Sequence, residues 1–397
     1  MSNKKKRLLM IGSYPIVKPI HGGQRRSYEL LKNYLKLGFE VEFIGAYLES
    51  NYSKDKRGVN DIVISNKIYH DNLNFMNYLV GFEAREDIII PKLIINLKKL
   101  SNKLNNTINN FDIIHFEQPF MFQAVNKKIL ENKTVIFGSH NIEEDLFDHL
   151  LAKKYVKKIT TDLLKFGKFV IVCSENEKQY YLKLDKYKQI IEIPNAVSPK
   201  SVDQFGQTKI KNLLNKEKIK QYLLFVSSAH EPNFNSFMKI IGFKLGFLDD
   251  EQFIVVAGNL SYLMKIKLAE SNDPRSIIIE NKVKYFFELN DQELQALIDQ
   301  STGIILPIVY GSGSNLKTAE ALYSGKNIVA TSFAFRGYEP YMKFANVKIA
   351  DNSDDFTNYM QQMFNQKSLP VAYDKNKLTW QHSFSQNNKK LRELINE

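Results

Sequence analysis

The chain has a single cysteine, Cys173, among 397 residues. An intrachain disulfide is therefore impossible, and a reducing compartment is favoured. No apolar run reaches the ~18 residues that a membrane-spanning helix needs. The apolar part of the basic N-terminus is short and is not followed by a small-residue cleavage site, so we interpret it as a buried strand. These absences favour a cytoplasmic globular protein.

Two ligand-binding signatures are also missing. The first strand is not followed by G-x-G-x-x-G, which counts against a nicotinamide-dependent dehydrogenase. No Asp-x-Asp occurs, which argues against the usual metal–diphosphate bridge, and we expect no metal. The net charge of +12 indicates an anionic partner, although a lysine excess serves solubility equally well. Nucleic acid is not expected, because no groove-reading motif is present.

The apolar pattern alternates between strand and helix periods along the whole chain. A first series begins with the strand 7–13, a glycine-containing loop, a helix and the strand 41–44. A polar stretch at 198–207 reads as a linker, and a second series begins with the strand 222–227. This recurrence predicts an α/β protein with two Rossmann-like domains built on parallel sheets.

The stretch from Gly303 to Thr331 reads as strand, glycine loop, helix and strand. A glycine loop before a helix directs backbone N–H groups and the positive end of the helix dipole at one point, which suits a phosphate. Lys317 adds a cation in the first turn, and Glu320 is an acceptor that suits a ribose diol. An ordinary βαβ unit with a loose turn explains these residues equally well.

Polar residues follow two predicted strands of the first series. Glu117 follows one strand, and His140 and Asn141 follow the next. Ligands of open α/β sheets bind at the carboxyl ends of strands, so His140 is a candidate site residue. A lone histidine there can also be a capping or solvated residue. On the sequence alone, this second interpretation is favoured. Basic amphipathic helices are predicted at 91–104 and 150–168, and a strand at 276–280.

Taken in order, the motifs resemble those of bacterial glycosyltransferases of family 4, which have the GT-B architecture of two facing Rossmann-like domains. The resemblance covers nearly the whole length. Its strongest part is Gly311-Ser312-Gly313, then Lys317 and Glu320, then Val329-Ala330-Thr331 and Gly337. The other motifs are Gly22-Gly23 with Arg25 or Arg26, residues 111–115, 140–143 and 193–196, Ser174-Glu175 and Pro232-Asn233.

The resemblance implies an acceptor domain over 1–197, a donor domain over 198–375 and a segment 376–397 that crosses back to the first domain. It implies catalytic roles for His140, Lys317 and Glu320, and acceptor contacts from Glu117 and Asn141. Donor-binding residues would be Gly22, Gly23, Ser228, Asn233, Tyr285, Phe286, Ser312, Gly313, Ser314, Asn315, Lys317 and Glu320. No cofactor is implied beyond a nucleotide-sugar co-substrate, for which a UDP-sugar is favoured.

Two departures from the family pattern stand out. The first glutamate of the paired-glutamate motif is absent, because its place is taken by Ser312 or, from another anchor, Tyr310. The basic pair that neutralises the diphosphate after the first strand of the donor domain is also missing from residues 227–233. Lys317 can supply that charge instead.

The expected function is a retaining, metal-independent transfer of a sugar from a nucleotide sugar to a glycan, as in polysaccharide or lipid-linked oligosaccharide synthesis. A lipid-linked acceptor and the two basic helices would bring the first domain to the inner face of an anionic membrane. The alternatives are a catalytically silent subunit that binds a glycan or a partner transferase, and a nucleotide-sugar epimerase of GT-B shape.

Overall fold

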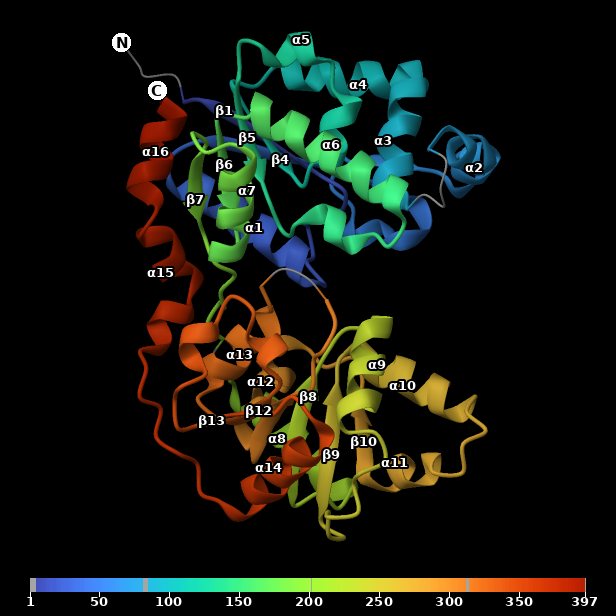
Figure 1. The fold of residues 1–397 in the computed structure, drawn as a ribbon, viewed down its shortest axis with the longest axis vertical. Coiled ribbons are helices and arrows are strands. Elements are labelled where there is room, and N and C mark those ends of the chain that lie inside the picture. Colours follow the sequence, from blue (N-terminus) through green and yellow to red (C-terminus); the bar gives the residue numbers. More distant parts are fainter. Residues whose placement is uncertain (1–4, 81–84, 201, 312–313, 397) are drawn as a thin grey trace. The chain divides into compact units, whose positions relative to one another are not determined.

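The computed structural model describes residues 5–80, 85–200, 202–311 and 314–396 (Figure 1). The chain forms two compact units. Unit 1 comprises Met1–Pro194 together with Ser383–Glu397, and unit 2 comprises Asn195–His382. Each unit has its own hydrophobic core around a parallel sheet.

Unit 1 is built on a seven-stranded sheet in the order β3-β2-β1-β4-β5-β6-β7. Every pairing is parallel, and β1 lies between β2 and β4. The strands are apolar runs buried on both faces, as parallel sheets require. They are β1 (Arg7–Gly12), β2 (Glu40–Leu48), β3 (Ile62–Ile64), β4 (Ile113–Glu117), β5 (Thr134–Gly138), β6 (Phe169–Val172) and β7 (Gln189–Glu192).

Helices connect these strands. They are α1 (Gly22–Lys36), α2 (Asn66–Val80), α3 (Glu86–Asn96), α4 (Lys98–Asn109), α5 (Lys127–Leu130), α6 (Leu150–Phe166) and α7 (Glu175–Leu184). The last helix, α16 (Asn388–Asn396), also packs on unit 1, where Lys390 Nζ donates to the carbonyl of Ile190 and Asn388 pairs with Asn33. The C-terminal segment therefore completes the unit that the N-terminus begins.

The predicted single helix over 91–104 is wrong. Leu97 leaves helical geometry with ψ of 89°, and the chain forms α3 and α4 instead. The break lets both helices bury apolar residues, such as Leu93 on α3 and Leu104 on α4.

The other predicted basic helix, over 150–168, is present as α6. Its buried face includes Ala152 and Val156, whereas Leu151 is 49% exposed. Among the helices of the described residues, none has the length and hydrophobicity needed to span a bilayer.

Unit 2 is built on a six-stranded parallel sheet in the order β10-β9-β8-β11-β12-β13. The strands are β8 (Gln221–Val226), β9 (Gln252–Ala257), β10 (Val283–Phe286), β11 (Gly303–Leu306), β12 (Asn327–Ala330) and β13 (Val347–Ile349). The helices are α8 (Gln204–Lys216), α9 (Glu231–Ile240), α10 (Asn259–Ala269), α11 (Ser276–Lys282), α12 (Asp291–Gln300), α13 (Leu316–Ser324) and α14 (Ser353–Asn365). Helix α15 (Trp380–Ser385) carries the chain back into unit 1.

The strand predicted at 276–280 is wrong, because these residues form α11. Three consecutive isoleucines favour a strand by propensity. In the folded unit, however, Ile279 is fully buried, Ile278 is partly buried against the core, and Ile277 is 55% exposed. The helix completes the crossover from β9 to the edge strand β10, so the connection overrides the local preference.

Both sheets confirm the expected α/β class with two parallel, Rossmann-like cores. In each sheet the order reverses beside the first strand, between β1 and β4 in unit 1 and between β8 and β11 in unit 2. Open parallel sheets bind ligands at the carboxyl edge of such a switch point. The carboxyl edges beside these two switch points are therefore the expected ligand sites of the two units.

Candidate active site

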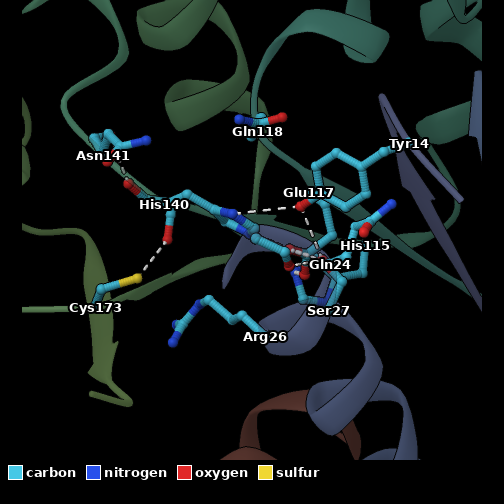
Figure 2. Close-up of polar contacts among 12 residues, drawn as sticks. Tyr14, Gln24, Arg26, Ser27, His115, Glu117, Gln118, His140, Asn141 and Cys173 are labelled. Atoms are coloured by element: carbon cyan, nitrogen blue, oxygen red, sulfur yellow. Dashed lines mark hydrogen bonds and ion pairs between the residues drawn. The ribbon is translucent and has the colours of Figure 1, made fainter. Parts of the chain in front are cut away.

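The carboxyl ends of β4 and β5 bring Glu117 and His140 together (Figure 2). Glu117 is the last residue of β4 and lies opposite Gly138, the last residue of β5, two positions before His140. A Cβ on Gly138 would lie 2.4 Å from His115 Nε2 and 3.1 Å from Glu117 Oε1. The glycine therefore leaves the room that this polar cluster occupies.

The Glu117 carboxylate is the centre of the cluster. Its Oε2 pairs with Nε2 of His140 and accepts a hydrogen bond of 2.8 Å from Ser27 Oγ. Its Oε1 lies 3.1 Å from Nε2 of His115. Glu117 is fully buried, so it holds the neighbouring side chains in place and does not present itself to an acceptor.

The charges of the cluster follow from its burial. Burial raises the pKa of Glu117, but His140 and His115 oppose it more strongly and lower the pKa to about 2. Burial lowers the pKa of His115 to about 4 in spite of the attraction of Glu117, so His115 is neutral at pH 7. An ionised carboxylate only accepts hydrogen bonds, so Nε2 of His140 carries a proton.

The other nitrogen of His140 lies at the start of α1. Nδ1 is 3.4 Å from the hydroxyl of Tyr14. Gly22 and Gly23, predicted to end the preceding loop, are the first two residues of α1. A Cβ on Gly23 would lie 3.5 Å from His140 Nδ1 and 3.3 Å from Tyr14 Oη, so the glycine lets the helix begin against the imidazole.

The start of α1 has the character of an anion site. His21 is the N-cap of the helix and accepts from the N–H of Gln24 at 3.4 Å. Burial, and then the proximity of His140 and Arg25, lower the pKa of His21 to about 4. His21 is therefore uncharged at pH 7, and the positive end of the helix dipole together with Arg25 favours an anion such as phosphate.

Arg26, the residue after Arg25, has a structural role. Its guanidinium is buried and donates to the carbonyls of Ile193, at 2.7 Å, and Val172, at 3.4 Å. Arg26 therefore ties α1 to the ends of β6 and β7. It also contributes to the low pKa of Glu117.

A second carboxyl lies beside the cluster. Glu143 is fully buried, and its Oε1 accepts from Gln118 Nε2 at 3.4 Å. Burial, and then the charges of Asp87 and Glu177, raise the pKa of Glu143 to about 8. Gln118 has a left-handed backbone with φ of 69°, a strained conformation of the kind found at functional sites.

Asn141, the other predicted acceptor residue, follows His140 directly. Its carbonyl accepts from Ser139 Oγ at 3.0 Å.

In unit 2 the glycine loop lies between β11 and α13. Ser312 and Gly313 fall outside the described residues. Asn315 is the N-cap of α13, and its Nδ2 donates to the carbonyl of Ala334 at 3.1 Å. Ser314 Oγ accepts from Asn195 Nδ2 at 2.8 Å. These bonds fix the backbone that leads into the helix.

Lys317 and Glu320 follow on the first two turns of α13, and both are half-buried. Burial lowers the pKa of Lys317, while Glu320 raises it and Arg336 lowers it further. Arg336 was not predicted as a site residue. It lies in the turn after β12, directly before Gly337.

The remaining predicted donor residues lie on other elements of unit 2. Ser228 follows β8, and its carbonyl accepts from Asn233 Nδ2 at 3.0 Å. Tyr285 and Phe286 lie on the edge strand β10 and line a cavity of about 590 Å³ with residues of α8 and α10. Among the described residues, no member of the glycine loop lines that cavity.

Comparison with known proteins shows what the chain is similar to. Residues 20–201 match the model of Glycosyltransferase Family 4. By sequence, no curated protein matches the chain.

Solved structures match over the full length at low identity. HepE from Anabaena in complex with UDP-glucose is 11% identical, with a TM-score of 0.66 over 97% of this chain and 99% of its own. Sucrose-phosphate synthase from Thermosynechococcus elongatus is 12% identical, with a TM-score of 0.65 over 98% and 99%. A mutant of S. aureus TarM in complex with fondaparinux, alpha-GlcNAc-glycerol and UDP is 11% identical, with a TM-score of 0.65 over 98% and 100%. These likenesses confirm the expected GT-B fold.

Proposed function

Since residues 20–201 match the model of Glycosyltransferase Family 4 and the whole chain has the GT-B fold, we propose that this protein transfers a sugar from a nucleotide sugar to a glycan. One observation carries the proposal: the ionised Glu117 holds His140 against the N-terminus of α1. A helix N-terminus with a fixed imidazole suits the leaving nucleoside diphosphate of a sugar donor.

The donor is a UDP-sugar, in line with the UDP-glucose bound to HepE and the UDP bound to the TarM mutant. Glu320 grips the ribose diol, and Ser314, Asn315 and Lys317 receive the diphosphate. In unit 1, the start of α1 at Gly22 and Gly23 is likewise suited to a phosphate. A thermal-shift screen with UDP-, GDP-, ADP- and dTDP-sugars tests the donor. A ligand at ~100 times its dissociation constant stabilises the fold by roughly 2.7 kcal/mol. Absence of a shift with all four would contradict a nucleotide-sugar donor.

The reaction proceeds with retention and without a metal ion. The bond between the anomeric carbon and the diphosphate oxygen breaks, and the acceptor hydroxyl forms the new glycosidic bond on the same face. The hydroxyl proton passes to the departing diphosphate. Each unit offers a helix N-terminus suited to the negative charge that develops on the diphosphate, α1 with His140 in unit 1 and α13 with Lys317 in unit 2. NMR of the product distinguishes an α- from a β-linkage. A product with the same anomeric configuration as the donor supports retention.

A catalytically silent subunit is the second candidate function. It is favoured by the absence of the first motif glutamate, whose place is taken by Ser312 or Tyr310. Such a subunit binds a glycan without turnover. Transfer or hydrolysis of a labelled nucleotide sugar by the pure chain decides against it, and interconversion of the sugar without an acceptor would indicate an epimerase.

Glu320→Ala is expected to weaken donor binding by about 10- to 100-fold, because an unpaired ribose diol in a closed site costs roughly 1–3 kcal/mol. Isothermal titration with the nucleotide sugar from the screen measures the change. Glu270→Ala, at the exposed end of α10, is the control and should bind as the wild type does. An affinity equal to the control would remove Glu320 from the donor site.

The acceptor is a lipid-linked glycan, and unit 1 touches an anionic membrane through lysines of α4 and α6. The apolar faces of both helices are buried in the core, so their exposed lysines, among them Lys99, Lys154 and Lys157, are turned to solvent. Near an anionic surface each lysine contributes about 1 kcal/mol, and the attraction fades within a Debye length.

Sedimentation with vesicles tests this contact. The wild type should bind anionic but not zwitterionic vesicles at low salt. Binding should fall when Lys153, Lys154, Lys157 and Lys158 become glutamine. It should persist when Lys216, Lys218 and Lys220 of unit 2 are changed in the same way. Failure to bind either kind of vesicle would favour a soluble acceptor.

A further inference from the structure

The turn after β12 packs directly on the glycine loop of unit 2. The carbonyl of Arg336 accepts from the N–H of Asn315 at 3.3 Å, and the carbonyl of Ala334 accepts from Asn315 Nδ2 at 3.1 Å and from Thr318 Oγ1. A Cβ on Gly337 would lie 2.7 Å from the Cβ of Ser314. The two segments are therefore locked together, and a side chain of the turn keeps a fixed place beside the loop.

Arg336 is the charged side chain of that turn. Its Nη1 donates to the carbonyl of Phe333 at 2.5 Å, and its guanidinium carbon lies 3.8 Å from the centre of the Phe333 ring. Its Nη2 lies 3.3 Å from the position that a Cβ on Gly311 would take. Gly311, with φ of 125°, thus lets the loop approach the guanidinium closely.

Lys317 is close enough to Arg336 to feel its charge. Burial lowers the pKa of Arg336 to about 10, although Glu339 opposes the change. Burial also lowers the pKa of Lys317, and Arg336 lowers it further. Two half-buried cations near one another favour the binding of an anionic ligand.

The backbone at this place favours the same ligand. Leu316 and Lys317 are the first residues of α13, where the N–H groups of a helix have no carbonyl partner within the helix. The end of β8, where the family carries its basic pair, reads Ser227-Ser228-Ala229-His230 and has neither lysine nor arginine. Of these two stretches, only the start of α13 and the turn beside it carry positive side chains, Lys317 and Arg336.

We propose that Arg336 binds the diphosphate of the donor together with Lys317 and replaces the basic residues that are missing after β8. The inference rests on the proposed function, because it assigns a further residue to the same donor site. A planar guanidinium suits this task, since it can bind two phosphate oxygens at once.

Titration calorimetry of Arg336→Gln tests the assignment. The probes are inorganic pyrophosphate, the nucleoside diphosphate of the base identified in the donor screen, and its nucleoside. Loss of a hydrogen-bonded charge should weaken binding of pyrophosphate and of the nucleoside diphosphate by about 10- to 100-fold. Affinity for the nucleoside, which has no phosphate, should not change. Arg336→Lys should retain more of the affinity than Arg336→Gln.

Arg275→Gln is the matched control. Arg275 also stacks on a phenylalanine of unit 2, at 4.5 Å from the ring of Phe243, but it is exposed and paired with Asp273. It should bind all probes as the wild type does. Wild-type affinity for pyrophosphate and the nucleoside diphosphate in Arg336→Gln would overturn the inference and leave the proposed function intact. Pyrophosphate binding that depends on Arg336, without binding of any of the four nucleoside diphosphates, would support the inference and overturn the proposed function.

Discussion

His140→Ala is expected to lower the turnover number by about 10²–10³-fold, a loss of the size found when one fixed polar group beside a developing charge is removed. The imidazole is held on one side by the ionised carboxylate of Glu117 and meets the first turn of α1 on the other. A truncated side chain removes this fixed group from the reacting phosphate. Because His140 is proposed to act on the charge that develops during the reaction, KM for the donor should change much less than kcat.

Initial rates of transfer at saturating donor measure the effect. His149→Ala is the control, because His149 caps the start of α6 and is not part of the polar cluster around Glu117. Its turnover should equal that of the wild type. An unfolding midpoint near that of the wild type excludes loss of the fold as the cause. Normal turnover by folded His140→Ala would remove this histidine from the reaction.

The largest expected change in stability is a gain, caused by Glu143→Gln. Its pKa of about 8 means that the folded chain keeps a proton that the unfolded chain releases near pH 4.5. The unfolded state therefore binds fewer protons between these values, and the wild type loses stability as the pH rises through this window. A carboxamide has no such transition. At about 1.4 kcal/mol per pKa unit, the variant should be more stable by roughly 3–5 kcal/mol at pH 9.

Urea unfolding of both proteins at pH 4.5 and pH 9 checks this expectation. The difference should be small at pH 4.5, where Glu143 is protonated in the folded state and only about half ionised in the unfolded state. Glu293→Gln is the contrasting control. The Glu293 carboxylate closes the capping box of α12 and pairs with Lys209 at 2.6 Å, which lowers its pKa. Glu293→Gln should therefore lose stability at pH 9. Equal stability of Glu143→Gln and the wild type at pH 9 would show that Glu143 ionises without cost.

Much of the fold could be predicted from the sequence, because strand and helix periods are local signals. Glu117 and His140 were each found at a strand end. Their pairing depends on β4 and β5 being neighbours, which no local pattern states. His115 could have been found, since it stands two residues before Glu117 and so shares its side of β4. Tyr14, Ser27 and Arg336 join their sites only through the order of the strands, which is a property of the complete sheet.

The place of α16 has a consequence for synthesis of the protein. Domains generally fold as the ribosome releases them, the N-terminal domain first. Here the N-terminal unit includes Ser383–Glu397, where the carbonyl of Ile395 accepts from Lys6 Nζ at 3.1 Å. The growing chain must release all of Asn195–His382 before that unit receives its last helix. The unit that starts first on the ribosome is therefore completed last, and a premature stop codon near the end of the message would damage the half of the protein that was translated first.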